Sequence, residues 1–300
     1  MEREYESDIL HARSKHAETD EEEEMFLSEI HIRPENGMVD GRYIISNFYI
    51  TVPSQYIKSG YNLPTSISIR HAMGSSLSQV GTQVWSGALL LADFLLSVPE
   101  VIRNEYVVEL GAGTGLSGLC AALCGAKTVF CTDNENRILE NCRWNAEYVR
   151  SDVKKLCKNV GSIKVRYLDW LDKNNPLLRG EDPVKKSLFS WTQENLQEVA
   201  KAKVILAADV IYDDVLTDAF IYFITQLLSL RQDRVLYISM EKRINFSLDQ
   251  LKEVAEAYEH FFNALQNSDL KAEQINIDFP KWFDYIRTKE LELWKISLKG

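Results

Sequence analysis

The 300-residue sequence lacks the features of membrane-spanning, disulfide-bonded and zinc-binding proteins. No uninterrupted apolar run approaches the roughly 18 residues that a membrane-spanning helix needs. The N-terminus is acidic, unlike a basic leader followed by an apolar segment. The five cysteines are odd in number and show neither CxxC spacing nor a matching histidine cluster. We therefore expect a soluble intracellular protein with reduced thiols, no membrane contact and no metal site.

The negative charge of the chain is concentrated at its N-terminus. Residues 1–24 hold ten acidic and three basic side chains, a balance of −7 out of a net charge of −10. Such an acidic run cannot bury enough apolar surface to offset the entropy lost on ordering. We expect a disordered tail over residues 1–28, which is either merely solvated or docks a basic partner. The near-neutral remainder argues against direct nucleic-acid binding, because phosphate recognition needs a concentrated basic surface.

Segments of strand and helix character alternate along most of the chain. The β-branched and aromatic segments 42–52 and 65–71 predict an N-terminal β-hairpin. The fold class is therefore α/β: a Rossmann-like, mostly parallel, seven-stranded sheet with helices on both faces and this hairpin as an extension. Residues 29–80 form the extension and residues 81–300 the main domain, with an insertion at about 171–202. The expected helices are 85–96, 116–124, 137–149, 215–229 and 248–266, and the expected strands are 106–110, 128–133, 163–168, 204–208, 234–239, 272–278 and 291–297.

The first strand of this sheet runs directly into a glycine-rich loop. Residues 109–115 read ELGAGTG, and an apolar helix follows at once, as in nucleotide sites. Gly111, Gly113 and Gly115 let the backbone approach a ligand without a Cβ clash. The alternatives are a merely tight turn, or a dinucleotide site, because residues 113–118 also fit GxGxxG. Glu109 favours a cationic ligand over a pyrophosphate, and S-adenosylmethionine carries both an ammonium and a sulfonium.

Asp133 ends the second predicted strand, 24 residues after Glu109. Its carboxylate is placed to accept hydrogen bonds from the two hydroxyls of a ribose. The alternative is a structural role, because aspartate is a good helix cap and a predicted helix follows. Either way, the carboxylate lies at the edge of the sheet where the glycine loop begins.

Two further motifs accompany the glycine loop and Asp133. Residues 81–88 read GTQVWSGA and residues 209–212 read DVIY. With these four motifs the chain resembles the seven-strand methyltransferases, and within them methyltransferase family 16, whose members modify mostly lysines in non-histone proteins. The resemblance implies S-adenosylmethionine as methyl donor, with Glu109 bonding its methionine moiety. The other implied donor contacts come from Trp85, Gly111, Ala112, Gly113, Asp133, Trp170 and Ala208.

Some of these contacts have a physical reason in the residue type. The indole of Trp170 suits stacking against adenine, and the Asp169 carboxylate suits accepting a bond from the exocyclic amine of adenine. For Trp170 and Trp85 alike, ordinary core packing is the alternative, because both lie in locally apolar stretches.

Asp209 and Tyr212 lie just beyond the carboxyl end of the fourth strand, the rim where open α/β sheets bind ligands. We expect Tyr212 to hydrogen-bond the acceptor amine, and Asp209 to hold its charged form or to accept a proton. The alternatives are that Asp209 caps the helix that follows and that Tyr212 packs under the loop. Glu241 and Arg243, which follow the fifth strand, are assigned to substrate docking.

The resemblance implies protein-lysine N-methylation in the nucleus and also the cytoplasm. No two prolines are adjacent, so the [NDS]PP[YF] element of adenine and glutamine amino methyltransferases is missing. The implied acceptor is a basic, nucleic-acid-binding protein, with the DNA/RNA-binding protein Kin as a candidate and chaperones as further partners. The alternatives are a nicotinamide-dependent oxidoreductase, a non-catalytic interaction module and a small-molecule methyltransferase.

Overall fold

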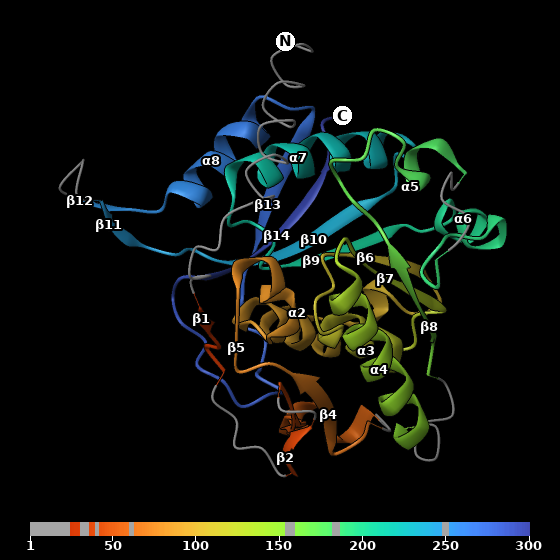
Figure 1. The fold of residues 1–300 in the computed structure, drawn as a ribbon, viewed down its shortest axis with the longest axis vertical. Coiled ribbons are helices and arrows are strands. Elements are labelled where there is room, and N and C mark those ends of the chain that lie inside the picture. Colours follow the sequence, from red (N-terminus) through yellow and green to blue (C-terminus); the bar gives the residue numbers. More distant parts are fainter. Residues whose placement is uncertain are drawn as a thin grey trace.

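The computed structural model describes residues 25–30, 36–39, 42–59, 63–153, 160–181, 187–247 and 252–300. Its centre is a seven-stranded sheet in the order β13-β14-β10-β9-β6-β7-β8 (Figure 1). The five strands from β10 to β8 are parallel, and β14 runs antiparallel to both of its neighbours. The predicted mostly parallel sheet of seven strands is confirmed. Its strands are β6 (Tyr106–Leu110), β7 (Thr128–Asp133), β8 (Ser162–Tyr167), β9 (Val204–Ala208), β10 (Val235–Glu241), β13 (Leu270–Ile275) and β14 (Leu291–Leu298).

Helices cover both faces of the sheet. On one face lie α2, α3 and α4, and on the other lie α5, α6, α7 and α8 (Figure 1). The helices are α2 (Ser86–Ser97), α3 (Leu116–Leu123), α4 (Asn136–Val153), α5 (Pro176–Arg179), α6 (Gln193–Val199), α7 (Asp214–Ser229) and α8 (Glu256–Gln266). Short 3₁₀ helices are η1 (Ser54–Ser59), η2 (Leu77–Thr82) and η3 (Pro99–Val101).

The alternation of side chains along each strand divides the core into two layers. In β6, Val107 packs into the layer below α2 and α3, and Val108 into the layer below α7. In β9, Leu206 packs into the layer below α2 and α3, and Ile205 into the layer below α7. All four side chains are at most 4% exposed, which explains why these strands appear in the sequence as continuous apolar runs.

The N-terminal extension is larger than the predicted hairpin. β2 (Asn36–Val39), β3 (Tyr43–Tyr49) and β4 (Ser66–His71) form an antiparallel three-stranded sheet. Arg70 of β4 joins it to α4, because its backbone N–H and C=O bond to Asn145 and its guanidinium lies 4.8 Å from the ring of Trp144. The extension is thereby fixed to the main domain.

The predicted tail extends too far. Residues 1–24 lie outside the described residues, but β1 (Phe26–Leu27) pairs with β5 (Gly74–Ser75) in a two-stranded antiparallel sheet. The Ser28 N–H also donates to the Met73 carbonyl at 2.9 Å. Residues 26–28 therefore belong to the folded protein, because backbone pairing with a distant segment stabilises them.

The predicted helix 248–266 is also too long. α8 begins only at Glu256, and β12 (Lys252–Val254) pairs with β11 (Asn245–Ser247) in its place. The insertion predicted at 171–202 contains α5 and α6, which pack on the main sheet. By length and composition, Leu77–Ser97 is apolar enough to span a membrane. However, 78% of this window is buried inside the protein, as in a core helix.

Candidate functional site

The glycine loop adopts a backbone that other residues would strain. Gly111 and Gly113 have φ angles of +61° and +55°. A Cβ on Gly111 would lie 2.7 Å from Val210 Cγ1, and one on Gly113 would lie 2.9 Å from the carbonyl oxygen of Gly81. The loop is therefore packed directly against two other motif segments, 81–88 and 209–212.

Glu109 lies beneath this loop and is 2% exposed. Its Oε1 accepts a hydrogen bond from the Gly118 N–H at 3.1 Å, within the first turns of α3. Its Oε2 is buried without a hydrogen-bond partner among the described residues. Burial raises the pKa of Glu109 to about 7, against the opposing effects of Cys131 and the Gly118 N–H. The direct bond to a methionine moiety stays a prediction, while the structure shows Glu109 holding the start of α3.

The buried Glu109 carboxyl gives a stability prediction. Its folded-state pKa lies above the unfolded value of 4.5, so its contribution to stability is complete below pH 4.5 and is lost as the pH rises through about 7. Above pH 7 the ionised group is expected to cost up to about 3 kcal/mol. Glu109→Gln should therefore be more stable than wild type at pH 8 and nearly equal to it at pH 5. Urea unfolding of both ligand-free proteins measures this difference.

An exposed carboxylate provides the control for this prediction. Glu147 is 66% exposed and pairs with Arg143 one helical turn away. Glu147→Gln should show no such pH-dependent gain, because an exposed ion pair contributes little. A Glu109→Gln protein that is less stable than wild type at pH 8 contradicts the predicted burial cost.

Asp133 connects the end of β7 to the glycine loop. Its Oδ2 accepts from the Gly113 N–H at 3.1 Å, and its Oδ1 accepts from the Asn134 N–H at 2.9 Å. Burial raises the pKa of Asp133 to about 6. The carboxylate thus sits at the loop, where a ribose would lie, and these two bonds do not cap α4, which begins at Asn136.

The predicted adenine contacts, Asp169 and Trp170, follow the end of β8. Trp170 is half-buried, and its ring lies 3.5 Å from the position that a Cβ on Gly111 would occupy. The ring also packs edge-on against Phe220, with 5.0 Å between the two ring centroids. Asp169 Oδ1 accepts from the Leu171 N–H at 2.9 Å. Ala208, the last residue of β9, is half-buried. Trp170 is thus packed in the core and also borders the loop, so both of its predicted roles remain compatible with its position.

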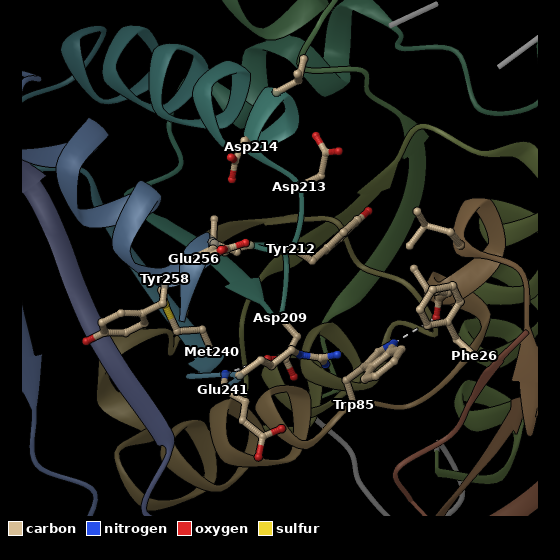
Figure 2. Close-up of a pocket in the computed structure, with 16 residues that line it drawn as sticks. Phe26, Trp85, Asp209, Tyr212, Asp213, Asp214, Met240, Glu241, Glu256 and Tyr258 are labelled. Carbon is tan, nitrogen blue, oxygen red and sulfur yellow. Dashed lines mark hydrogen bonds between the residues drawn. The ribbon is translucent and has the colours of Figure 1, made fainter. Parts of the chain in front are cut away.

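A pocket of about 610 Å³ opens at the carboxyl ends of β9 and β10 (Figure 2). Its wall is lined by apolar and aromatic side chains and by acidic ones. The Trp85 indole is fixed in the wall by its Nε1–H, which donates to the Val80 carbonyl at 3.0 Å. The apolar and aromatic side chains include Trp85, Ile211, Tyr212, Met240 and Tyr258, and the acidic ones include Asp209, Asp213, Asp214, Glu241 and Glu256.

Asp209 holds the framework of this pocket. It has a φ of +52°, its Oδ2 accepts from the Gly87 N–H at 2.6 Å, and its Oδ1 accepts from the Glu241 N–H at 3.0 Å. Both carboxylate oxygens are therefore engaged with backbone, which ties the start of α2 to the end of β10. The alternative that Asp209 caps the following helix is wrong, because Asp213 caps α7 through the Leu216 N–H. A proton-accepting role for Asp209 stays a prediction. An incoming proton would compete with the two backbone N–H groups for the carboxylate oxygens.

Tyr212 lines the same pocket and is 43% exposed. Burial, followed by the charges of Asp133 and Asp213, raises the pKa of its hydroxyl to about 12. The hydroxyl therefore stays protonated at neutral pH and can donate or accept a hydrogen bond without serving as a base. Val210, between the pocket residues Asp209 and Ile211, packs against Gly111 and so connects this wall of the pocket to the glycine loop.

The predicted docking residues Glu241 and Arg243 both line the pocket. Among the described residues, no ion pair joins these two. Arg243 pairs instead with Glu29, at 3.2 Å between Nη2 and Oε1, and its guanidinium lies 4.7 Å from the centre of the Trp85 ring. Sequence reasoning missed the pocket residues from distant segments, among them Phe26 and Glu256. Asp213 and Asp214 follow the DVIY motif directly, and this adjacency was a usable signal.

The site fits S-adenosylmethionine. The glycine loop has a backbone so closely packed that a Cβ would clash with neighbouring segments, Asp133 presents a carboxylate beside the loop, and Glu109 has a buried oxygen without a hydrogen-bond partner in the described part of the chain. The two carboxylates suit a ligand with ribose hydroxyls, an ammonium and a sulfonium. Among the described residues, no cluster of histidine, cysteine and acidic side chains is suited to a metal.

Comparison with known proteins points to the same family. A family model described as lysine methyltransferase matches residues 64–183. Methyltransferase-like protein 22 of Mus musculus is 39% identical over 243 residues, covering 78% of this chain and 59% of the relative. The protein of that name in Homo sapiens is 39% identical over 240 residues, covering 77% and 57%. Protein-lysine N-methyltransferase EEF2KMT of Mus musculus is 25% identical over 175 residues, covering 56% and 47%.

The chain spans less than two thirds of the length of these curated relatives. The family match nevertheless includes the tryptophan motif, the glycine loop, Asp133 and Trp170, in the order that the sequence predicted. The resemblance expected from the sequence is therefore confirmed. On this evidence, the chain belongs to the lysine methyltransferase family of the class I S-adenosylmethionine-dependent methyltransferases.

Proposed function

We propose that this chain transfers a methyl group from S-adenosylmethionine to the side-chain amine of a lysine in a non-histone protein. The observation that carries the proposal is the pocket beside the glycine loop, which joins an aromatic wall to an acidic rim. An aromatic wall suits the aliphatic stem of a lysine, and acidic side chains attract its charged end. The names of the relatives support the same reaction class.

S-Adenosylmethionine supplies a methyl group that its sulfonium has already activated toward attack by a neutral amine. The protein must therefore align the acceptor lysine and help it lose its proton. With an ordinary lysine pKa near 10.4, deprotonation at pH 7 costs about 4.6 kcal/mol. Apolar surface disfavours the charged amine, and Trp85, Ile211 and Met240 supply such a surface in the pocket wall.

The acidic side chains are placed to receive the lysine before it loses its proton. Asp213 and Asp214 stand at the start of α7, and Glu256 begins α8 (Figure 2). All three line the pocket mouth from elements that lie beyond the ends of the parallel strands. Their combined charge favours an acceptor lysine with basic neighbours, because like charges there would repel an acidic segment.

Tyr212 is the residue of the pocket best suited to orient the acceptor amine. We expect Tyr212→Phe to lower kcat about tenfold, the cost of one hydrogen bond, and to leave the KM for S-adenosylmethionine unchanged. Steady-state methyl transfer to a lysine acceptor measures both quantities. Tyr222→Phe is the matched control, because Tyr222 lies on α7, is 60% exposed and does not line the pocket. Equal kcat values for wild type and Tyr212→Phe contradict this role.

The acceptor that we propose is a basic, nucleic-acid-binding protein, and the DNA/RNA-binding protein Kin is the candidate. The acidic pocket rim supports this acceptor chemistry. The proposed sites of action are the nucleus and the cytoplasm, and chaperones are further proposed partners. Nucleic acid is not expected to bind this chain directly, because the pocket rim is acidic and the net charge is −10.

Radiolabelled S-adenosylmethionine tests the proposed function. The purified chain is incubated with Kin, with cell extract protein and with the low-mass fraction of the extract, and labelled products are identified by mass spectrometry. Nε-methyllysine in protein, absent with Asp133→Ala, is the expected result. Label in the low-mass fraction alone indicates a small-molecule methyltransferase. Tight binding of the methyl donor without transfer to any fraction indicates a non-catalytic module.

A further inference from the structure

The N-terminal segment 25–30 contributes a wall of the pocket. Phe26 lines the pocket, and its carbonyl accepts from Gln83 Nε2 at 2.9 Å. Pairing of β1 with β5 and the Ser28 bond to Met73 fix Phe26 and the two residues that follow it. The segment therefore presents its next residue, Glu29, at a defined place beside the pocket.

Glu29 holds Arg243 against the tryptophan of the pocket. Glu29 Oε1 lies 3.2 Å from Arg243 Nη2, and Glu29 Oε2 accepts from the Ser86 hydroxyl at 3.4 Å. The guanidinium is 4.7 Å from the centre of the Trp85 ring, a favourable cation–π position. Arg243 is thus held by Glu29 on one side and by the indole face on another.

Arg243 is a cation beside an acidic cavity. Among the described residues that line the pocket it is the only basic one, and five lining residues carry carboxylates. Burial raises the pKa of Glu29, Arg243 lowers it, and Glu241 and Asp209 raise it, so these four groups lie within electrostatic range of one another. A released guanidinium would therefore be attracted to the same carboxylates that are proposed to receive a lysine.

We propose that Glu29 is a positioning residue that keeps the Arg243 guanidinium on the face of Trp85 and so leaves the acidic pocket free for the acceptor lysine. This inference rests on the proposed function of the pocket. Arg243 is tethered next to the site, so its effective concentration is high, and an unrestrained guanidinium competes with an incoming amine. Glu29 thereby acts on substrate binding without touching the substrate.

The test is the binding of Nα-acetyl-lysine methylamide to the full chain saturated with S-adenosylhomocysteine, measured by ligand-observed NMR. This probe carries one cation, and the acidic N-terminal residues are the same in every variant. Glu29→Gln is expected to weaken binding about fivefold, the effect of one partly exposed ion pair. Adding Arg243→Gln is expected to restore the wild-type affinity, because the competing cation is gone. Arg243→Gln alone is expected to bind the probe at least as tightly as wild type, whereas the docking role predicted for Arg243 from the sequence would make this variant bind more weakly.

Two controls separate competition from net charge and from general loss of an ion pair. The double variant Glu29→Gln with Lys242→Gln has the same net charge as Glu29→Gln with Arg243→Gln, but it retains Arg243. Lys242 lies over the Tyr258 ring and does not line the pocket. Binding of the probe to this control is expected to stay weak. Glu105→Gln, which breaks the pair with Lys203 elsewhere, is expected to bind normally.

Equal affinity of wild type and Glu29→Gln overturns the inference. The inference is also overturned if adding Arg243→Gln to the Glu29→Gln protein fails to restore binding of the probe, or if adding Lys242→Gln restores it equally well. A wild-type protein that methylates lysine but gives one of these results refutes the role of Glu29 alone. A wild-type protein that neither binds the probe nor methylates lysine refutes the role of Glu29 and the proposed function together.

Discussion

Replacing Asp133 with alanine is expected to weaken the binding of S-adenosylhomocysteine about a hundredfold or more. The carboxylate is the predicted acceptor for two ribose hydroxyls, and it also holds the Gly113 N–H at 3.1 Å. The variant therefore loses ligand contacts and one of the bonds that shape the loop. Calorimetric titration of the purified protein measures the loss, and near-wild-type affinity contradicts the assigned site.

The pH dependence of this binding provides a second check on Asp133. Burial raises its pKa to about 6, so the ligand-free carboxyl takes up a proton as the pH falls through that value. A protonated carboxyl accepts fewer hydrogen bonds, and we expect binding to weaken below about pH 6. Asp133→Asn, which cannot ionise, should bind weakly at every pH without this transition. The comparison separates titration of Asp133 from titration of the ligand.

Replacing Arg234 with methionine is expected to lower the free energy of unfolding by about 3 kcal/mol or more. Arg234 is 2% exposed and donates to four backbone carbonyls near the C-terminal ends of α6 and α7. The carbonyl of Val199 also accepts from the Ala202 N–H at 2.9 Å, and the guanidinium supplies side-chain donors to all four carbonyls together. Methionine fills a similar volume but offers these carbonyls no donor. Urea unfolding monitored by circular dichroism measures the change.

Arg231→Met is the control for this prediction. Arg231 is 34% exposed and pairs with Asp233 in the same turn, so its loss is expected to leave the free energy of unfolding nearly unchanged. Equal stabilities of Arg234→Met and wild type contradict the anchoring role. Arg234 directly precedes β10, at the amino ends of the parallel strands, whereas the glycine loop follows the carboxyl end of β6, so ligand binding by the folded fraction should be preserved.

The structure explains why three of the four sequence motifs occur together. The carbonyl of Gly81 contacts the glycine loop at Gly113, and the carboxylate of Asp209 bonds the Gly87 N–H. Val210 packs against Gly111. The tryptophan motif, the loop and the DVIY motif are therefore one packed unit, and a change in any of them disturbs the others.

Much of the fold could be predicted from local patterns. The parallel strands β6, β7, β9 and β10 are buried on both faces, so they appear as apolar runs, and β6, β7 and β9 begin and end at the predicted residues. The glycine loop and Asp133 were also predictable, because strand ends of a parallel sheet meet at one edge. The hairpin β11–β12 was missed, because its pairing depends on contacts that helical periodicity does not reveal.

The sequence by itself determined the sheet, the glycine loop and the family, because these depend on residues that are close together in the chain. Only the tertiary structure decided what the side chains of the pocket do. It turned Asp209 toward the Gly87 and Glu241 backbone and brought Glu29 to Arg243, more than 200 residues away. No local pattern encodes such pairs, because burial and distance across the fold determine which polar groups find one another.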